Sequence, residues 1–309
     1  MSRLFTREEE KAWWDQIRNN PGTSFWHLYT KPPENGIIVS DKESLDIAVT
    51  YMAIAAKETN VSILAYAVMS NHFHWLLRCD DSSASAFFKR FQHLLDNYLS
   101  RHGKGRAMRV LTCDKKEILS LKQFRDEVSY ILRNPYVIRS DVNMMSNPWT
   151  SSFLYFNPIV SLLPARPANN LTKREKRCLL KSSTLVIPPG LSVSDGKIQP
   201  LSFVDYKAVE ALFFNARKYV TWLLKSVESQ VEVSRRYGES VNLPDEELAP
   251  IVWKYCKDRF GDADTSHLQP GQINELVREF KYNYSASNAQ IARLTDIPLQ
   301  KIETMFPKL

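Results

Sequence analysis

The chain of 309 residues contains no run of eighteen apolar residues and only four cysteines. The missing apolar run argues against a transmembrane helix, and the charged N-terminus, MSRLFTREEEKAWWDQ, does not resemble a signal peptide. The cysteines are scattered without a CxxC pair, so the sequence indicates neither a zinc knuckle nor a disulfide framework. We therefore expect a cytoplasmic protein that has no membrane partner.

The charge balance favours a partner that carries phosphates. Lys and Arg number 41 against 34 Asp and Glu, which gives a formal net charge of +7 and a sequence pI of about 9.1. A protein that neutralises phosphates has such an excess, although many proteins without a nucleic-acid role reach it too. The 44% hydrophobic content is ordinary for a globular protein and allows one large core or two smaller domains.

Two histidines lie on either side of one apolar residue in the strand-like run AYAVMSNHFHWLLR. Because side chains alternate along a strand, His72 and His74 point one way while Phe73 and Trp75 point the other. Two parallel imidazoles form half of a site for a divalent cation. The alternative is a pair of partly buried histidines that only bond their neighbours.

An amphipathic helix is predicted over residues 121–134, because apolar side chains recur there at helical spacing. We expect it to end before Pro135. Tyr130 and Asn134 are four residues apart and share a face of this helix. If that face lies over the histidines, the amide completes a metal site and the phenol becomes a nucleophile for a phosphodiester. Taken singly, each of the two residues is better explained by a structural role, Tyr130 as a core tyrosine and Asn134 as a helix cap.

Three ordered motifs, MSNHFHWLL, SYILRNP and NPWTSSFLY, resemble the REP-associated tyrosine transposases of the single-tyrosine HUH endonuclease superfamily. The resemblance covers residues 20–160. It implies an α+β fold, a ferredoxin-like split βαβ antiparallel sheet with helices on one face. It also implies that His72, His74 and Asn134 hold Mg²⁺ or Mn²⁺ and that Tyr130 cleaves single-stranded DNA through a 5′-phosphotyrosine.

The same resemblance implies hairpin-containing repeat DNA as substrate and favours a monomer acting in cis over a homodimer. The sequence departs from the pattern after Tyr136, where VIRSDV replaces a small Ala-Gly pair. A catalytically silent DNA-binding regulator and a replication-type or relaxase-type nickase remain open alternatives. Tyr98 and Tyr136 are less favoured nucleophiles, and Asp126 and Glu127 are minor candidates for ligand or base.

The order of predicted elements agrees with a split βαβ sheet. We expect helices over residues 7–19, 45–57 and 82–101, and strands over 25–31, 62–69, the histidine segment and 108–112. The predicted domains are a catalytic domain at 1–160, a basic and proline-bearing linker at 161–202, and a helical region at 203–309. Residues 286–306 have helix-turn-helix spacing.

Basic residues concentrate between the helix after the histidines and the Tyr130 helix. We expect the cluster to contact DNA phosphates, although for any single member a solvated loop explains its charge. In the predicted helix-turn-helix, Lys301 would face a DNA groove, although a purely structural pair of helices explains this segment equally well. The predicted DNA-binding residues are Arg101, Lys104, Arg106, Arg109, Lys115, Lys116 and Lys301.

Overall fold

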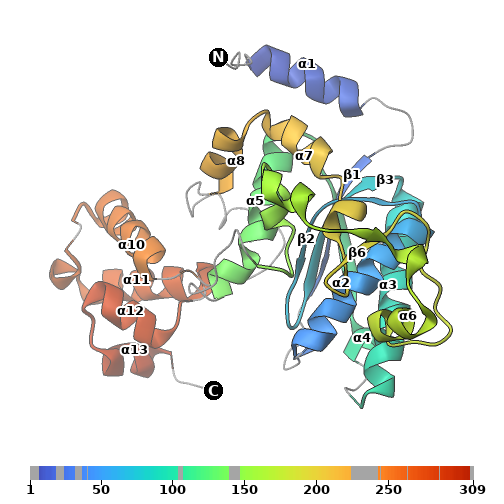
Figure 1. Cartoon of the computed structure of the whole chain (residues 1–309). Helices are drawn as coiled ribbons and strands as arrows, with labels where there is room; N and C mark the ends of the chain where they lie inside the picture. Colours follow the sequence, from blue (N-terminus) through green and yellow to red (C-terminus); the bar gives the residue numbers. More distant parts are fainter. Residues whose placement is uncertain are drawn as a thin grey trace. The chain divides into compact units, whose positions relative to one another are not determined.

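The chain divides into two compact units in the computed structural model (Figure 1). The first comprises Met1–Pro135 and Asn143–Leu223, and the second comprises Tyr136–Val142 and Leu224–Leu309. The structure describes residues 7–18, 24–31, 37–39, 41–103, 107–138, 147–223, 243, 245–262, 264–284 and 286–306. No helix among these residues has the length and apolar character that a membrane span requires.

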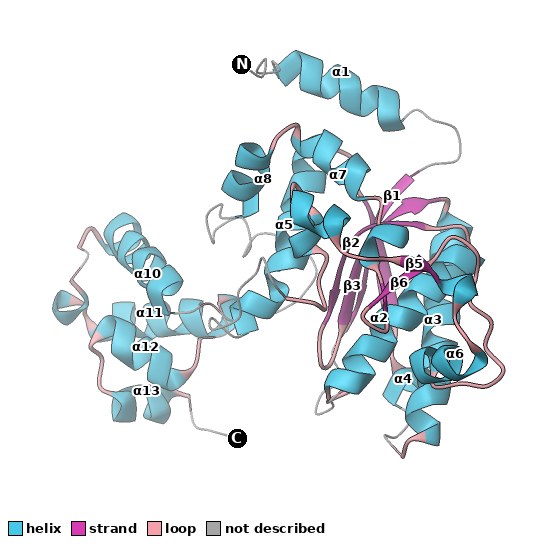
Figure 2. Cartoon of the chain, in the orientation of Figure 1, coloured by secondary structure: helices cyan, strands magenta, loops and turns pink. Residues whose placement is uncertain are grey.

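The first unit is built on a four-stranded sheet in which every neighbouring pair is antiparallel (Figure 2). The strands are β1 (Ser24–Thr30), β2 (Ser62–Val68), β3 (Phe73–Cys79) and β4 (Cys113–Glu117), and their spatial order is β2-β3-β1-β4. The predicted α+β class with an antiparallel sheet is confirmed.

Two helices, α2 (Lys42–Glu58) and α3 (Asp81–Arg101), cover one face of the sheet. Asp41 and Asp80 cap them, because each carboxylate accepts the backbone N–H of the residue three positions on. Trp75 on β3 packs edge-on against Phe87 and Phe91 of α3. These rings are fully buried and form the centre of the core.

The helix α5 (Leu121–Ile138) covers the opposite face, where Phe124 packs against Phe25 of β1. Glu127 of α5 also bonds His27 of β1. Helices therefore lie on both faces of the sheet, not on one as predicted, because α5 carries its own apolar stripe and needs a surface to bury it.

The predicted end of this helix before Pro135 is wrong, since α5 continues to Ile138. Proline costs one helical hydrogen bond, but tertiary contacts hold the segment. Pro135 is buried, Ser129 donates to the carbonyl of Trp222, and Arg133 donates to the carbonyl of Leu223. Asn134 consequently lies inside a continuous helix and does not cap its end.

The predicted strand at 108–112 is also wrong. Residues Ala107–Val110 form the short helix α4, and β4 begins only at Cys113. Met108 is fully buried, and the side-chain amide of Gln92 donates to the carbonyls of Met108 and Leu111. This tertiary contact closes a turn where the apolar run alone suggested extended backbone.

The predicted linker at 161–202 packs into the first unit. Leu180, Val193 and Ile198 belong to the same buried cluster as Trp75, and the boundary between the compact units falls after Leu223. The remaining elements of this unit are α1 (Arg7–Arg18), β5 (Arg166–Pro167), α6 (Lys173–Leu180), β6 (Ser192–Ser194), β7 (Lys197–Ile198), α7 (Tyr206–Phe213) and α8 (Ala216–Leu223).

The second unit contains α10 (Asp245–Phe260), α11 (Pro270–Asn283), α12 (Asn288–Thr295) and α13 (Leu299–Met305). Ile291, Ile297 and Ile302 are buried between the last two helices. The turn between them begins at Asp296, which adopts a left-handed conformation with φ of 52°. Aspartate tolerates this conformation better than most residues, so the turn forms without the glycine usual in helix-turn-helix segments.

Candidate functional site

The histidine pair lies at the start of β3. His74 is on the strand and fully buried, whereas His72 precedes the first strand residue and closes the β2-β3 turn. The backbone N–H of Met69 donates to the carbonyl of His72 at 3.0 Å. The two imidazoles share one side of the strand, with ring centroids 4.9 Å apart.

Helix α5 places Tyr130 and Asn134 over this pair. The side-chain oxygen of Asn134 lies 3.4 Å from His72 Nε2. The Tyr130 ring lies nearly perpendicular to the His74 ring, with centroids 5.6 Å apart, and is 3% exposed. The four residues that the sequence assigned to one site are thus brought together within one chain, while their chemical roles stay predictions.

The contacts of His72 leave one pair of acceptors facing each other. Nδ1 lies 2.8 Å from the side-chain oxygen of Asn71, and Nε2 faces the side-chain oxygen of Asn134. Burial lowers the pKa of His72 to about 4, although the contact with Asn134 opposes the shift, so the ring is neutral at pH 7. A neutral imidazole has one N–H, and with both amide oxygens in these positions it can satisfy only one of them.

A cation held by His72 Nε2 and Asn134 Oδ1 would relieve that conflict, because an imidazole lone pair and an amide oxygen are both metal ligands. His74 is neutral as well, because burial, together with His72 and His27, holds its pKa well below the usual range. Within the described part of the chain, no group of three His, Cys, Asp or Glu side chains is arranged to hold a metal. The donor set that fits is two neutral imidazoles and an amide oxygen.

A third histidine, His27 of β1, belongs to the same face and was missed by the sequence analysis. It is fully buried, its Nδ1 lies 3.0 Å from Glu127 Oε2, and its Nε2 lies 3.2 Å from His74 Nδ1. The available signal was a histidine two residues before Tyr29 in the apolar strand SFWHLYT, since alternate residues of a strand share a face.

Of the minor candidates of the sequence analysis, Glu127 bonds His27 beside the histidine pair, whereas Asp126 and Tyr98 have other partners. Asp126 accepts hydrogen bonds from Lys122 at 2.7 Å and from the indole of Trp222 at 3.0 Å. Tyr98 lies on α3, on the other side of the sheet, and donates to Glu43. Burial, with Glu43 adding to it, raises the pKa of Tyr98, which makes it a poorer nucleophile. The side chain of Tyr136 lies outside the described residues.

The predicted basic cluster is divided between the two faces of the sheet. Lys116 pairs with His27 in the β1-β4 register and so shares the face of the site. Lys115 points to the other face, where it bonds Asp81 and Ser85 at the start of α3.

The other predicted DNA contacts have partners on α3, belong to the second unit, or lie outside the described residues. Arg109 pairs with Asp96 at 2.9 Å, and Arg101 donates to the carbonyl of Asn97. Lys301 is exposed on α13, in the second unit. Lys104 and Arg106 lie outside the described residues.

The NPWTSSFLY segment has a structural position beside β2. Val68 donates to the carbonyl of Trp149, Ser151 donates to the carbonyl of Tyr66, and the phenol of Tyr155 donates to the carbonyl of Leu64. This segment therefore satisfies backbone groups along the outer edge of the sheet, and edge groups need such partners.

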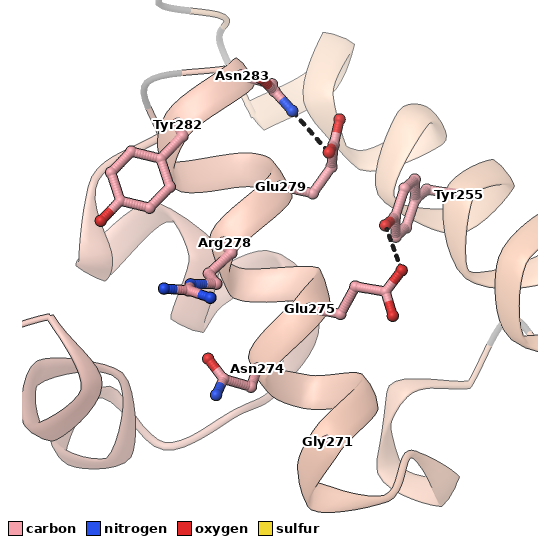
Figure 3. A pocket seen from close by; sticks show the side chains of 8 residues that line it. All are labelled: Tyr255, Gly271, Asn274, Glu275, Arg278, Glu279, Tyr282 and Asn283. Atoms are coloured by element: carbon pink, nitrogen blue, oxygen red, sulfur yellow. Dashed lines mark hydrogen bonds between the residues drawn. The ribbon is translucent and has the colours of Figure 1, made fainter.

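The second unit has a cavity of about 450 Å³ on α11 (Figure 3). Arg278 and Tyr282 line it together with two carboxylates, Glu275 and Glu279. Tyr255 donates to Glu275, and Asn283 donates to Glu279. Two carboxylates against one guanidinium make this cavity unsuitable for a phosphate, so the histidine face of the first unit remains the candidate site.

Among solved structures, one that is similar to this chain is described as the REP-associated tyrosine transposase bound to a REP hairpin. It is 16% identical to this chain, with a TM-score of 0.34, and the match covers 46% of this chain and 82% of that one. No protein-family model and no curated protein match the chain. At this identity and TM-score the likeness says nothing about the activity of this chain.

Proposed function

We propose that the protein is a metal-dependent single-stranded DNA endonuclease and strand transferase, a transposase that acts on hairpin-containing DNA. Its catalytic unit is a ferredoxin-like split βαβ fold. The observation that carries the proposal is the convergence of Tyr130 and Asn134 of α5 on His72 and His74, with Asn134 Oδ1 3.4 Å from His72 Nε2. The contact between Tyr130 and His74 within one chain supports a site completed in cis.

In this proposal His72, His74 and Asn134 hold Mg²⁺ or Mn²⁺. When bound, the ion withdraws charge from the scissile phosphate and so favours nucleophilic attack. Asn134 and Tyr130 are one helical turn apart, so α5 fixes the phenol relative to the ligands.

The Tyr130 phenol oxygen attacks phosphorus in line as its proton leaves, and the bond from phosphorus to the 3′ oxygen breaks. The products are a 5′-phosphotyrosine and a free 3′-hydroxyl. Because the ester retains the energy of the broken bond, a second 3′-hydroxyl can displace the tyrosine and rejoin the strand without ATP.

The test is covalent capture of DNA by the full chain with Mn²⁺ and a hairpin-bearing single strand. A label at the 3′ end is expected to run with the protein on a denaturing gel, whereas a label at the 5′ end is released as a fragment that a polymerase extends. Tyr130→Phe is expected to abolish the adduct. The matched control is Tyr98→Phe, which removes a buried phenol on the opposite face of the sheet.

Two results decide against the proposal. Binding of the hairpin strand without any adduct identifies the protein as a DNA-binding regulator. An adduct that survives in Tyr130→Phe and disappears in another tyrosine variant assigns the chemistry to a different residue.

A further inference from the structure

Three fully buried side chains form a chain of contacts behind the histidine pair. Glu127 of α5 lies 3.0 Å from His27 Nδ1, and His27 Nε2 lies 3.2 Å from His74 Nδ1. All three side chains have no exposed surface. These contacts connect α5, β1 and β3, and they end at Nδ1 of His74. The other ring nitrogen of His74 is Nε2.

The direction of the hydrogen bonds follows from what each group can donate. An ionised carboxylate only accepts, so His27 Nδ1 carries the proton that it donates to Glu127. If His27 carries only that proton, its Nε2 has a lone pair, and this lone pair accepts from Nδ1–H of His74. His74 is left with a lone pair on its own Nε2.

We propose that Glu127 and His27 are positioning residues that hold His74 in the Nδ1–H tautomer and so present its Nε2 lone pair as a metal ligand. The proposal rests on the metal site of the proposed function, adds His27, and gives Glu127 a role other than that of ligand or base. It extends a common arrangement, in which a ligating histidine donates its other N–H to a carboxylate, by one intervening imidazole.

The tautomer is measured directly, without metal and without DNA. In protein with ¹⁵N-labelled histidine at pH 7, long-range ¹H–¹⁵N correlation spectra report which ring nitrogen carries the proton. We expect His74 in the Nδ1–H form and His27 in the Nδ1–H form. A spectrum that shows His74 in the Nε2–H form, with His27 doubly protonated, overturns the proposal.

Variants then connect the tautomer to metal affinity, measured by titration with Mn²⁺ alone and detection by electron paramagnetic resonance. His27→Leu removes the acceptor and is expected to weaken binding about 10- to 100-fold, as loss of an outer ligand partner generally does. His27→Gln offers an amide oxygen to His74 Nδ1–H and is expected to restore part of the affinity. His93→Gln, at an exposed histidine of α3, is the matched control and is expected to bind as the wild type does.

Glu127→Gln tests the direction of the hydrogen bonds that connect Glu127, His27 and His74, and it changes the shape of the side chain little. Its amide can donate to His27 Nδ1, which reverses the hydrogen bonds, so we expect part of His74 to shift to the Nε2–H form. If His27→Leu binds Mn²⁺ as tightly as the wild type, the proposal is overturned. If His27→Leu does not fold, the wild-type and Glu127→Gln spectra still decide it.

The proposed function can fail separately. If the tautomers are as expected and no DNA adduct forms, the positioning chain holds and the strand-transfer chemistry does not. If Tyr130 forms the adduct while His74 shows the opposite tautomer, the chemistry holds and the role of Glu127 and His27 does not.

Discussion

His72 Nε2 and Asn134 Oδ1 lie 3.4 Å apart although 62 residues separate them in the chain. A neutral His72 can donate to only one of its two neighbouring amide oxygens, and a cation held by His72 Nε2 and Asn134 Oδ1 would remove that conflict. Asn134 is therefore the side chain to change in a test of the proposed metal site.

We expect Asn134→Leu to weaken Mn²⁺ binding, because it removes a proposed ligand. The loss should be at least the roughly 10- to 100-fold that generally follows removal of a residue that only bonds to a ligand. Asn134→Asp is expected to bind at least as tightly as the wild type, since a carboxylate replaces the amide oxygen. Calorimetric titration with Mn²⁺ measures both. Asn97→Leu, on the exposed surface of α3, is the control, and equal affinities for Asn134→Leu and the wild type contradict the assignment.

The core under α3 predicts a second, purely structural result. Leu77 of β3 is fully buried among the aromatic side chains of that face, whereas Leu162 is 79% exposed. Leu77→Ala is expected to lower the free energy of unfolding by about 2–5 kcal/mol, through lost burial and the cavity left behind. Leu162→Ala is expected to change it by no more than about 0.5 kcal/mol. Urea unfolding followed by circular dichroism compares the two, and similar values would place Leu77 outside the core.

Strong local periodicity is what made part of this fold predictable. The alternation of residues along the strand predicted that His72 and His74 point to the same side. The four-residue spacing of Tyr130 and Asn134 predicted that they share one face of α5. Both patterns depend on residues close in sequence. The structure adds that these faces meet, which no spacing alone determines.

The features that the sequence did not reveal depend on contacts between distant segments. His27 joins the site only because β1 lies beside β3, so its histidine reaches His74 47 residues away. The turn at Met108 is closed by Gln92, and Pro135 continues a helix because Ser129 and Arg133 bond to the backbone of α8. In each case a tertiary hydrogen bond outweighs the local preference of the chain.

The ion pair that holds α1 predicts a dependence of stability on pH. Arg125 is 3% exposed and bonds Glu10 of α1 at 2.9 Å, and Lys218 also bonds Glu10. Burial raises the pKa of Glu10, but the hydrogen bonds from Arg125 and Lys218 outweigh it, so the pKa lies below its ordinary value. The carboxylate therefore stabilises the fold at pH values above about 4.3, and this contribution is lost as the pH falls through the lowered pKa.

Glu10→Gln is expected to reduce the free energy of unfolding at pH 7 by about 1.5–3 kcal/mol, the usual value of a hydrogen bond to a charged group. The difference from the wild type should shrink as the pH is lowered from 6 to 3, because the wild type loses the same interaction by protonation. Urea unfolding at each pH measures it. A difference that stays constant over this range shows that the charge of Glu10 contributes nothing.

The two adjacent lysines of β4 provide the sharpest test of where DNA lies. Lys116 pairs in register with His27 and shares the face of the site, whereas Lys115 bonds Asp81 and Ser85 on the opposite face. If single-stranded DNA crosses the histidine face, Lys116→Ala is expected to weaken binding of a hairpin-bearing single strand. The slope of log K against log salt concentration is then expected to fall by about 0.7 for each lost phosphate contact. Lys115→Ala is expected to leave affinity and slope unchanged.

Fluorescence anisotropy over a salt series compares the two variants, which have the same charge and neighbouring positions. A larger loss for Lys115→Ala places the DNA on the α3 face and away from Tyr130.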